Sequence, residues 1–96
     1  MKIIWIYEAK IDLLSVRAHI TKDSEIAARK VVEKIMTYTE SQLTLFPHSG
    51  KVGRCVGTYE IKVPKLPYYV PYRIKSDRVE ILRVYHTSRV WPENLS

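Results

Sequence analysis

The sequence predicts an α+β fold, in which two helices follow a first strand and precede an antiparallel sheet. Residues 2–7 are β-branched and aromatic, residues 8–45 repeat apolar side chains every three or four positions, and the chain from Arg54 onward alternates apolar and polar residues. The expected order is β-α-α-β-β-β, with a possible fourth strand of the later sheet near Arg54. A chain of 96 residues, 46% hydrophobic and 27% charged, corresponds to one domain over residues 1–96.

The two predicted helices lie between residues 8 and 45. In the first, residues 8–20, apolar side chains fall at helical spacing at Ile11, Leu14 and Ala18. Asp23 or Ser24 offers an N-cap oxygen for the second helix, which should run to about residue 45 before Pro47 bars its continuation. Its apolar stripe comprises Ala28, Val32, Ile35, Thr39 and Leu43.

The second half of the chain should form the sheet. Successive strands are predicted at residues 58–63, 66–74 and 78–85, with a hairpin turn at residues 76–77. Pro71 cannot donate to a strand ladder, so its strand should lie at an edge or carry a bulge there. Strict alternation predicts one face packed on the helices and one wet face. The polar side chains of the wet face are Glu60, Lys62, Arg78 and Glu80.

Charge is concentrated in the C-terminal half. The chain carries 16 Lys and Arg against 10 Asp and Glu, a net charge of +6. Residues 1–50 hold seven basic and six acidic side chains, and residues 51–96 hold nine and four, so the second half supplies +5. A field polarised in this way indicates an anionic partner, such as a nucleic acid, a nucleoprotein or an acidic peptide.

Residues for a disulfide, a metal site or export are missing from the sequence. Cys55 is the single cysteine, and the three histidines match no zinc spacing, so we expect neither metal nor cofactor. The apolar N-terminal run is too short for a signal peptide or a membrane span. We therefore expect a cytoplasmic protein without membrane contact.

Two motifs resemble a known family. Gly57-Thr58-Tyr59-Glu60-Ile61 precedes the strands, and after the last strand comes a His-x-x-Arg-x-Trp-Pro tail made by His86, Arg89, Trp91 and Pro92. Together with the order of elements, they resemble the RelE/ParE toxins, and most closely the ParE-like branch. The resemblance implies a toxin of a type II, plasmid-stabilisation toxin-antitoxin module. A cognate antitoxin would wrap its apolar groove, and operator DNA would be reached only through that antitoxin.

Relatives in this family divide by target, so the fold does not settle the activity. ParE-like members poison DNA gyrase, which is the function we expect here. The alternative is RelE-like, ribosome-dependent cleavage of mRNA without a metal, which needs cationic clamps and a proton-transfer group. A third possibility is a module that only binds its antitoxin. The candidates for a nuclease site are Arg54, Arg73, Arg83 and His86.

The nuclease pattern is incomplete. RNA-cutting relatives usually carry a basic residue three positions before the Tyr of the penultimate strand, where this chain has Tyr69 before Tyr72. Many also carry a C-terminal Tyr that this chain lacks. The same cations can instead grip a large target, and apolar helix positions can hold the antitoxin. The residues expected at the target are Arg73, Arg83, Tyr85, Arg89 and Trp91, and those expected at the antitoxin are Leu14, Ala18, Val32 and Ile35.

Overall fold

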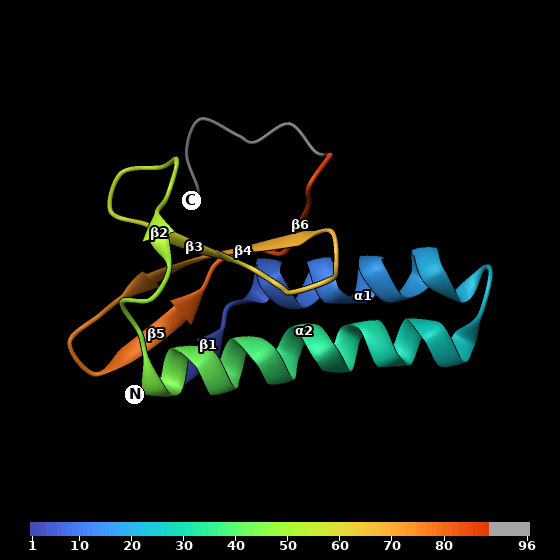
Figure 1. Cartoon of the computed structure of the whole chain (residues 1–96), viewed down its shortest axis with the longest axis horizontal. Helices are drawn as coiled ribbons and strands as arrows, with labels where there is room; N and C mark the ends of the chain where they lie inside the picture. Colours follow the sequence, from blue (N-terminus) through green and yellow to red (C-terminus); the bar gives the residue numbers. More distant parts are fainter. Residues whose placement is uncertain (89–96) are drawn as a thin grey trace.

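The computed structural model describes residues 1–88 and contains two helices and six strands in this part of the chain (Figure 1). The helices form an antiparallel hairpin below the sheet. Within residues 1–88, no helix is long and apolar enough to cross a membrane. The elements are β1 (Lys2–Trp5), α1 (Tyr7–Thr21), α2 (Glu25–Leu45), β2 (Lys51–Val52), β3 (Tyr59–Lys62), β4 (Tyr68–Ile74), β5 (Arg78–Ile81) and β6 (Tyr85–His86).

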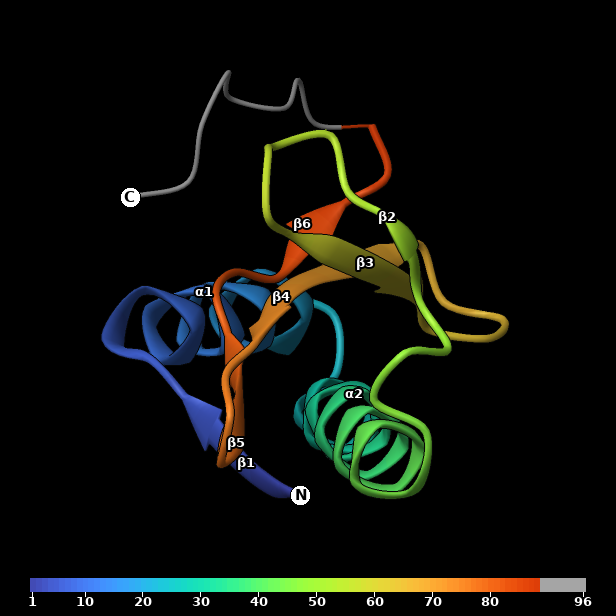
Figure 2. The same cartoon turned by 90° about the vertical axis from the view of Figure 1, so that its left-hand side faces the viewer.

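The sheet is mixed and mostly antiparallel, which confirms the predicted α+β class. Its strand order is β1-β5-β4-β3-β2, and β6 also pairs with β4 (Figure 2). β1 runs parallel to β5, whereas every other pairing is antiparallel. The long strand β4 is therefore the centre of the sheet, and the N-terminal strand joins it only through β5.

Local sequence signals set the helix ends. The Ser24 hydroxyl accepts a hydrogen bond from the Ala27 backbone N–H at 3.1 Å, so Ser24 is the N-cap of α2 as predicted. α2 ends at Leu45, two residues before Pro47. The hairpin turn at residues 76–77 is confirmed as well, since Lys75 N–H donates to the Arg78 carbonyl at 2.8 Å.

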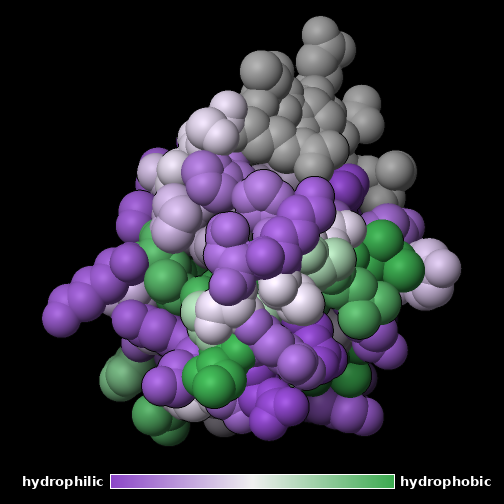
Figure 3. Space-filling model, turned by 90° about the vertical axis from the view of Figure 1, so that its right-hand side faces the viewer, coloured by the Kyte–Doolittle hydropathy of each residue, from purple (hydrophilic) through white to green (hydrophobic). Residues whose placement is uncertain are grey.

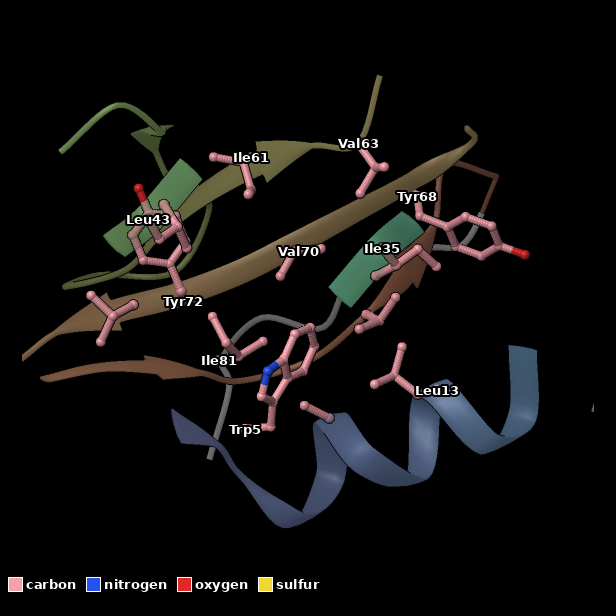
Figure 4. Packing of buried hydrophobic residues seen from close by; sticks show 13 residues of the cluster. Trp5, Leu13, Ile35, Leu43, Ile61, Val63, Tyr68, Val70, Tyr72 and Ile81 are labelled. Carbon is pink, nitrogen blue, oxygen red and sulfur yellow. The ribbon is translucent and has the colours of Figure 1, made fainter. Parts of the chain in front are cut away.

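The core lies between the helices and one face of the sheet. α1 buries Ala9 and Leu13, and α2 buries Ile35 and Leu43. Figure 4 shows how side chains from both helices and from alternate positions of the strands point into this space. At its margin, the Trp5 indole N–H donates to the Glu40 carboxylate at 3.0 Å. The sheet contributes Trp5, Ile61, Val63, Tyr68, Val70, Tyr72, Val79 and Ile81.

Pro71 lies in the middle of the central strand, so the edge position considered from sequence is wrong. A bulge is present opposite Pro71, but its extra residue belongs to the segment that pairs with β4. The pairs Tyr72–Ile81 and Tyr69–Tyr85 leave two residues of β4, 70 and 71, facing three of the partner segment, 82–84. Pro71 contributes only its carbonyl, which accepts the Leu82 N–H at 2.9 Å. The predicted strand over residues 78–85 is thereby divided into β5 and β6.

The possible strand near Arg54 is found slightly earlier, as the two-residue β2, and Arg54 itself follows it in a loop. The preceding loop is fastened by Tyr72. Its hydroxyl donates to the Pro47 carbonyl at 2.9 Å and accepts from the Gly50 N–H at 3.0 Å. Burial raises the pKa of Tyr72, which keeps the hydroxyl protonated for both roles.

We predict that Tyr72→Phe lowers the free energy of unfolding by about 1–3 kcal/mol, because a carbonyl and an N–H lose their partner while the ring stays. Urea unfolding followed by fluorescence measures the change. The matched control is Tyr7→Phe, at a side chain that is 72% exposed and should tolerate the change. Equal midpoints for Tyr72→Phe and wild type would contradict this role of the hydroxyl.

Candidate functional site

The structure distributes the predicted site residues over the sheet. Arg73 lies in β4, Arg83 in the bulge, and Tyr85 and His86 in β6, whereas Arg54 lies in the loop between β2 and β3. The Arg83 guanidinium carbon lies 4.8 Å from the centroid of the Tyr85 ring. Tyr85 is only 1% exposed, so its ring is buried and is not open to a target in the way the sequence analysis expects. Arg89 and Trp91 lie outside the described residues, and their assignment to the target stays a prediction.

Asp12 joins α1 to the bulge. Its carboxylate accepts two hydrogen bonds from the Arg83 guanidinium, at 2.7 and 3.1 Å, and a third from the Val84 backbone N–H at 2.9 Å. The hydrogen bond to Asp12 raises the pKa of Arg83. Because Asp12 is buried, its negative charge requires this bidentate partner. Arg83 is thereby held in a structural contact.

Glu80 is the acid of a second cluster, which also contains Arg73 and Arg78. This cluster lies on the outer face of the sheet, the face opposite the helices, which also carries Glu60. The Glu80 carboxylate receives the Arg73 Nε–H at 2.7 Å and the Arg78 Nε–H at 2.9 Å. These hydrogen bonds, that of Arg73 first, lower the pKa of Glu80. One carboxylate therefore neutralises part of the charge of two arginines.

Glu60 is the acid of a third cluster. Its carboxylate lies 3.5 Å from Lys51 Nζ and 3.7 Å from Arg54 Nε, and both of these cations also lie over the Tyr69 ring, 5.5 Å from its centroid. Only 1% of Glu60 is exposed. Here too a buried acid organises two basic side chains.

The predicted wet face is wrong for these two glutamates, since Glu60 and Glu80 are both buried. Lys51 and Arg54 compensate the charge of Glu60, and Arg73 and Arg78 compensate that of Glu80. Sequence reasoning also missed Asp12. The sequence did contain a signal for Asp12. Ala9, Asp12 and Leu13 share one helical face, and an acid on that face needs a buried partner.

His86 faces a separate cavity of about 450 Å³ between α1 and β6. The Ser88 backbone N–H donates to His86 Nδ1 at 3.1 Å, and the Ser88 hydroxyl lies 2.8 Å from the same nitrogen. Nδ1 therefore acts as an acceptor, which places the proton of the neutral ring on Nε2. The lining residues are Asp12, Ser15, Val16, His19, Tyr68, Val84, His86 and Ser88.

The four nuclease candidates do not share one centre. Arg73 lies on the outer face, whereas His86 pairs in register with Tyr68, whose side chain belongs to the core on the opposite face. Arg83 is held by Asp12, and Arg54 lies beside Glu60. Within residues 1–88, no group of three His, Cys, Asp or Glu side chains could hold a metal ion.

The antitoxin candidates on α1 are exposed. Leu14 is 61% exposed and Ala18 is also on the surface. With Tyr7 and Ile11, also exposed, they occupy positions i, i+4, i+7 and i+11 of one helix face. This α1 stripe, formed by Tyr7, Ile11, Leu14 and Ala18, lies opposite the buried face of the helix.

The candidates on α2 are less accessible. Val32 is half-buried and packs against the core. Ile35 has no exposed surface and is part of the core, so it is not available to a partner that binds the folded chain. The helical spacing of the apolar residues on α2 did not show which of them lie in the core and which lie on the surface.

Comparison with known proteins identifies the family. The sequence matches the family model of the ParE toxin of the type II toxin-antitoxin system parDE over residues 3–91. The chain belongs to the ParE toxin family. Membership of a type II system implies a cognate antitoxin as partner of this ParE-family toxin.

Individual relatives agree with this assignment. Y4kP of Sinorhizobium fredii, described as a toxin, is 40% identical over 94 residues, covering 98% of this chain and 96% of its own length. Toxin RelE2 of Caulobacter vibrioides is 27% identical over 89 residues, covering 93% and 98%. A solved structure of the chromosomal ParDE toxin-antitoxin system from P. aeruginosa has the same fold, with a TM-score of 0.84 at 22% identity, covering 92% of this chain and 97% of that one.

We predict that Asp12→Ala lowers the free energy of unfolding by about 3 kcal/mol or more, because the Arg83 guanidinium and the Val84 N–H lose a shared partner. Asp12→Asn should cost less, since its amide oxygen still accepts from Val84. Thermal and urea unfolding measure both changes, with the exposed Asp23→Ala as control. An Asp12→Ala chain as stable as the control would show that the contact contributes little.

Proposed function

We propose that this ParE-family toxin inhibits DNA gyrase by binding it, and that its antitoxin neutralises it by binding along α1. The observation that carries the proposal is that two arginines of the candidate site are already ion-paired within the chain. Arg73 is ion-paired with Glu80 and Arg83 with Asp12, each at 2.7 Å. Cations already held by carboxylates in this way do not converge on one reacting group, as phosphate chemistry requires. The family assignment supports the same reading.

The arrangement of the candidate residues does not favour the proton transfer that RNA cleavage requires. RNA cleavage requires a proton-transfer group and cations within reach of one phosphate. His86 lies on the cavity side and Arg73 on the outer face, so they would not act on the same phosphate from the described geometry. Tyr69 also occupies the position where nuclease relatives usually carry a basic residue.

The second candidate function remains ribosome-dependent cleavage of mRNA. The likeness to a relative named toxin RelE2 favours it. In that case Arg54, Arg73 and Arg83 would contact phosphates after leaving their carboxylates, and His86 would transfer a proton. A module that only binds its antitoxin is the third case and would cause no growth arrest.

We predict that the purified toxin inhibits supercoiling by gyrase and that His86→Ala inhibits equally well, because binding needs no proton transfer. Gel-based supercoiling assays at increasing toxin concentration measure both. For a nuclease, removal of the general acid or base would instead cost about 10²–10⁴-fold in the rate of RNA cleavage.

The decisive contrast uses the same two proteins on translating ribosomes. Toeprinting should reveal no new breaks in mRNA with either chain. Breaks that depend on His86, together with unaffected gyrase, would replace the first candidate function with the second.

The α1 stripe supports the antitoxin side of the proposal. An amphipathic helix or extended segment binds such a surface through apolar anchors at helical spacing. The stripe is unpartnered in the isolated chain, and a small domain gains stability when a partner covers its apolar surface.

We predict that Leu14→Asp weakens antitoxin binding by roughly tenfold or more, because a partner would bury an apolar side chain there at a gain of about 1.5–3 kcal/mol. Calorimetric titration with the antitoxin measures the affinity. Ile26→Asp, at a comparably exposed apolar residue of α2, is the control and should leave the affinity unchanged. Equal affinities for the two variants would place the antitoxin elsewhere.

A further inference from the structure

A second apolar surface lies where α2 ends and β2 begins, at the left of Figure 1. Phe46 is 58% exposed and Val52 is 80% exposed, and Leu45 is exposed beside them. We call this surface the Phe46 patch and define it by Leu45, Phe46, His48, Val52 and Ile74. The end of the molecule at the α1–α2 connection is, by contrast, mainly hydrophilic (Figure 3).

The Phe46 patch is hollowed. One depression of about 340 Å³ is lined by Phe46, Pro47, His48 and Ser49. A second, of about 410 Å³, is lined by His48, Val52, Gly57, Thr58, Tyr59 and Ile74. His48 borders both, so the two depressions are neighbours.

The patch is held in shape by the fold beneath it. Tyr72 fastens the loop through its hydrogen bonds to Pro47 and Gly50. The Tyr72 ring stacks on Tyr59 at 5.8 Å between centroids, and His48 meets Tyr59 edge-on at 6.2 Å. Two binding depressions supported by packed rings need little ordering on association, which favours affinity.

Charge around the patch indicates the kind of partner. The exposed charged residues next to the patch in sequence are Lys51 and Lys75, and the nearest exposed acid along the chain, Asp77, is ion-paired with Arg78. The N-terminal ammonium also lies here, donating to the Thr44 carbonyl at 3.2 Å. Positive charge therefore prevails at the edge of the apolar surface.

We propose that the Phe46 patch is the surface by which this toxin docks on gyrase, through an acidic surface of the target that presents apolar side chains. This inference rests on the proposed function and assigns it a contact surface away from Arg73 and Arg83, which are ion-paired, and from the buried Tyr85. A second copy would bring the same basic segments together and repel. A nucleic acid backbone would meet the cations but leave the exposed Phe46 and Val52 without apolar partners.

The test compares the double variant Phe46→Ser/Val52→Ser with wild type and with Ile26→Ser. Ile26 is 71% exposed on the same helix as Leu45, which has the same exposed fraction, but at the other end of that helix. Affinity for purified gyrase is measured by surface plasmon resonance at low and high salt, and supercoiling inhibition alongside. Thermal unfolding verifies that all three chains fold.

We expect the double variant to bind gyrase about tenfold more weakly or worse, Ile26→Ser to match wild type, and wild-type affinity to fall with salt. Lys75→Glu, which alters charge without touching an apolar side chain, should weaken binding as well. If the double variant binds and inhibits like wild type, the docking surface is elsewhere and only this inference fails. If wild type does not bind gyrase, the proposed function fails and the inference with it.

Two further outcomes would also overturn the inference. Loss of antitoxin affinity in the double variant, with gyrase affinity intact, would assign the patch to the antitoxin. A wild-type dimer that the double variant converts to a monomer, again with gyrase affinity intact, would assign it to a second copy.

Discussion

The contact of Asp12 with the bulge at residues 82–84 fixes the relation between helices and sheet. The bulge lies opposite Pro71, which is in the central strand and has no N–H to donate. The segment that pairs with β4 has one extra residue there, within residues 82–84. In this bulge the Val84 N–H lies outside the strand ladder. Asp12 accepts this N–H, and Arg83 compensates the charge that Asp12 brings into a buried place. Strand, bulge and helix therefore depend on one carboxylate.

Much of the fold follows from local signals. The order of elements, the Ser24 cap and the turn at residues 76–77 depend on short-range preferences that the residues themselves carry. That Pro71 would disturb its ladder was predictable for the same reason, because a missing donor is a property of one residue; that the extra residue would lie in the partner segment was not. The central position of Pro71 was not predictable either, since strand order is set by pairing between distant segments.

The site was harder to predict because its charges are cooperative. The alternation of apolar and polar residues assigns Glu60 and Glu80 to a wet face, because an isolated carboxylate is more stable in water. Only the fold brings Lys51 and Arg54 to one, and Arg73 and Arg78 to the other. The same limit affected Ile35, whose spacing is shared by core and surface positions and whose burial depends on how α2 sits on the sheet.

These clusters bear on how one fold serves different targets. A cation held by a buried acid keeps its position but gives up part of its charge, so it stabilises the sheet more than it attracts phosphate. Residues outside the clusters are not bound by that constraint. The α1 stripe and the Phe46 patch are both apolar and both supported by elements whose positions the core fixes. Substitutions there need not disturb Asp12 or Glu80, so the partner-binding surfaces that we propose can vary while the ion-paired framework stays.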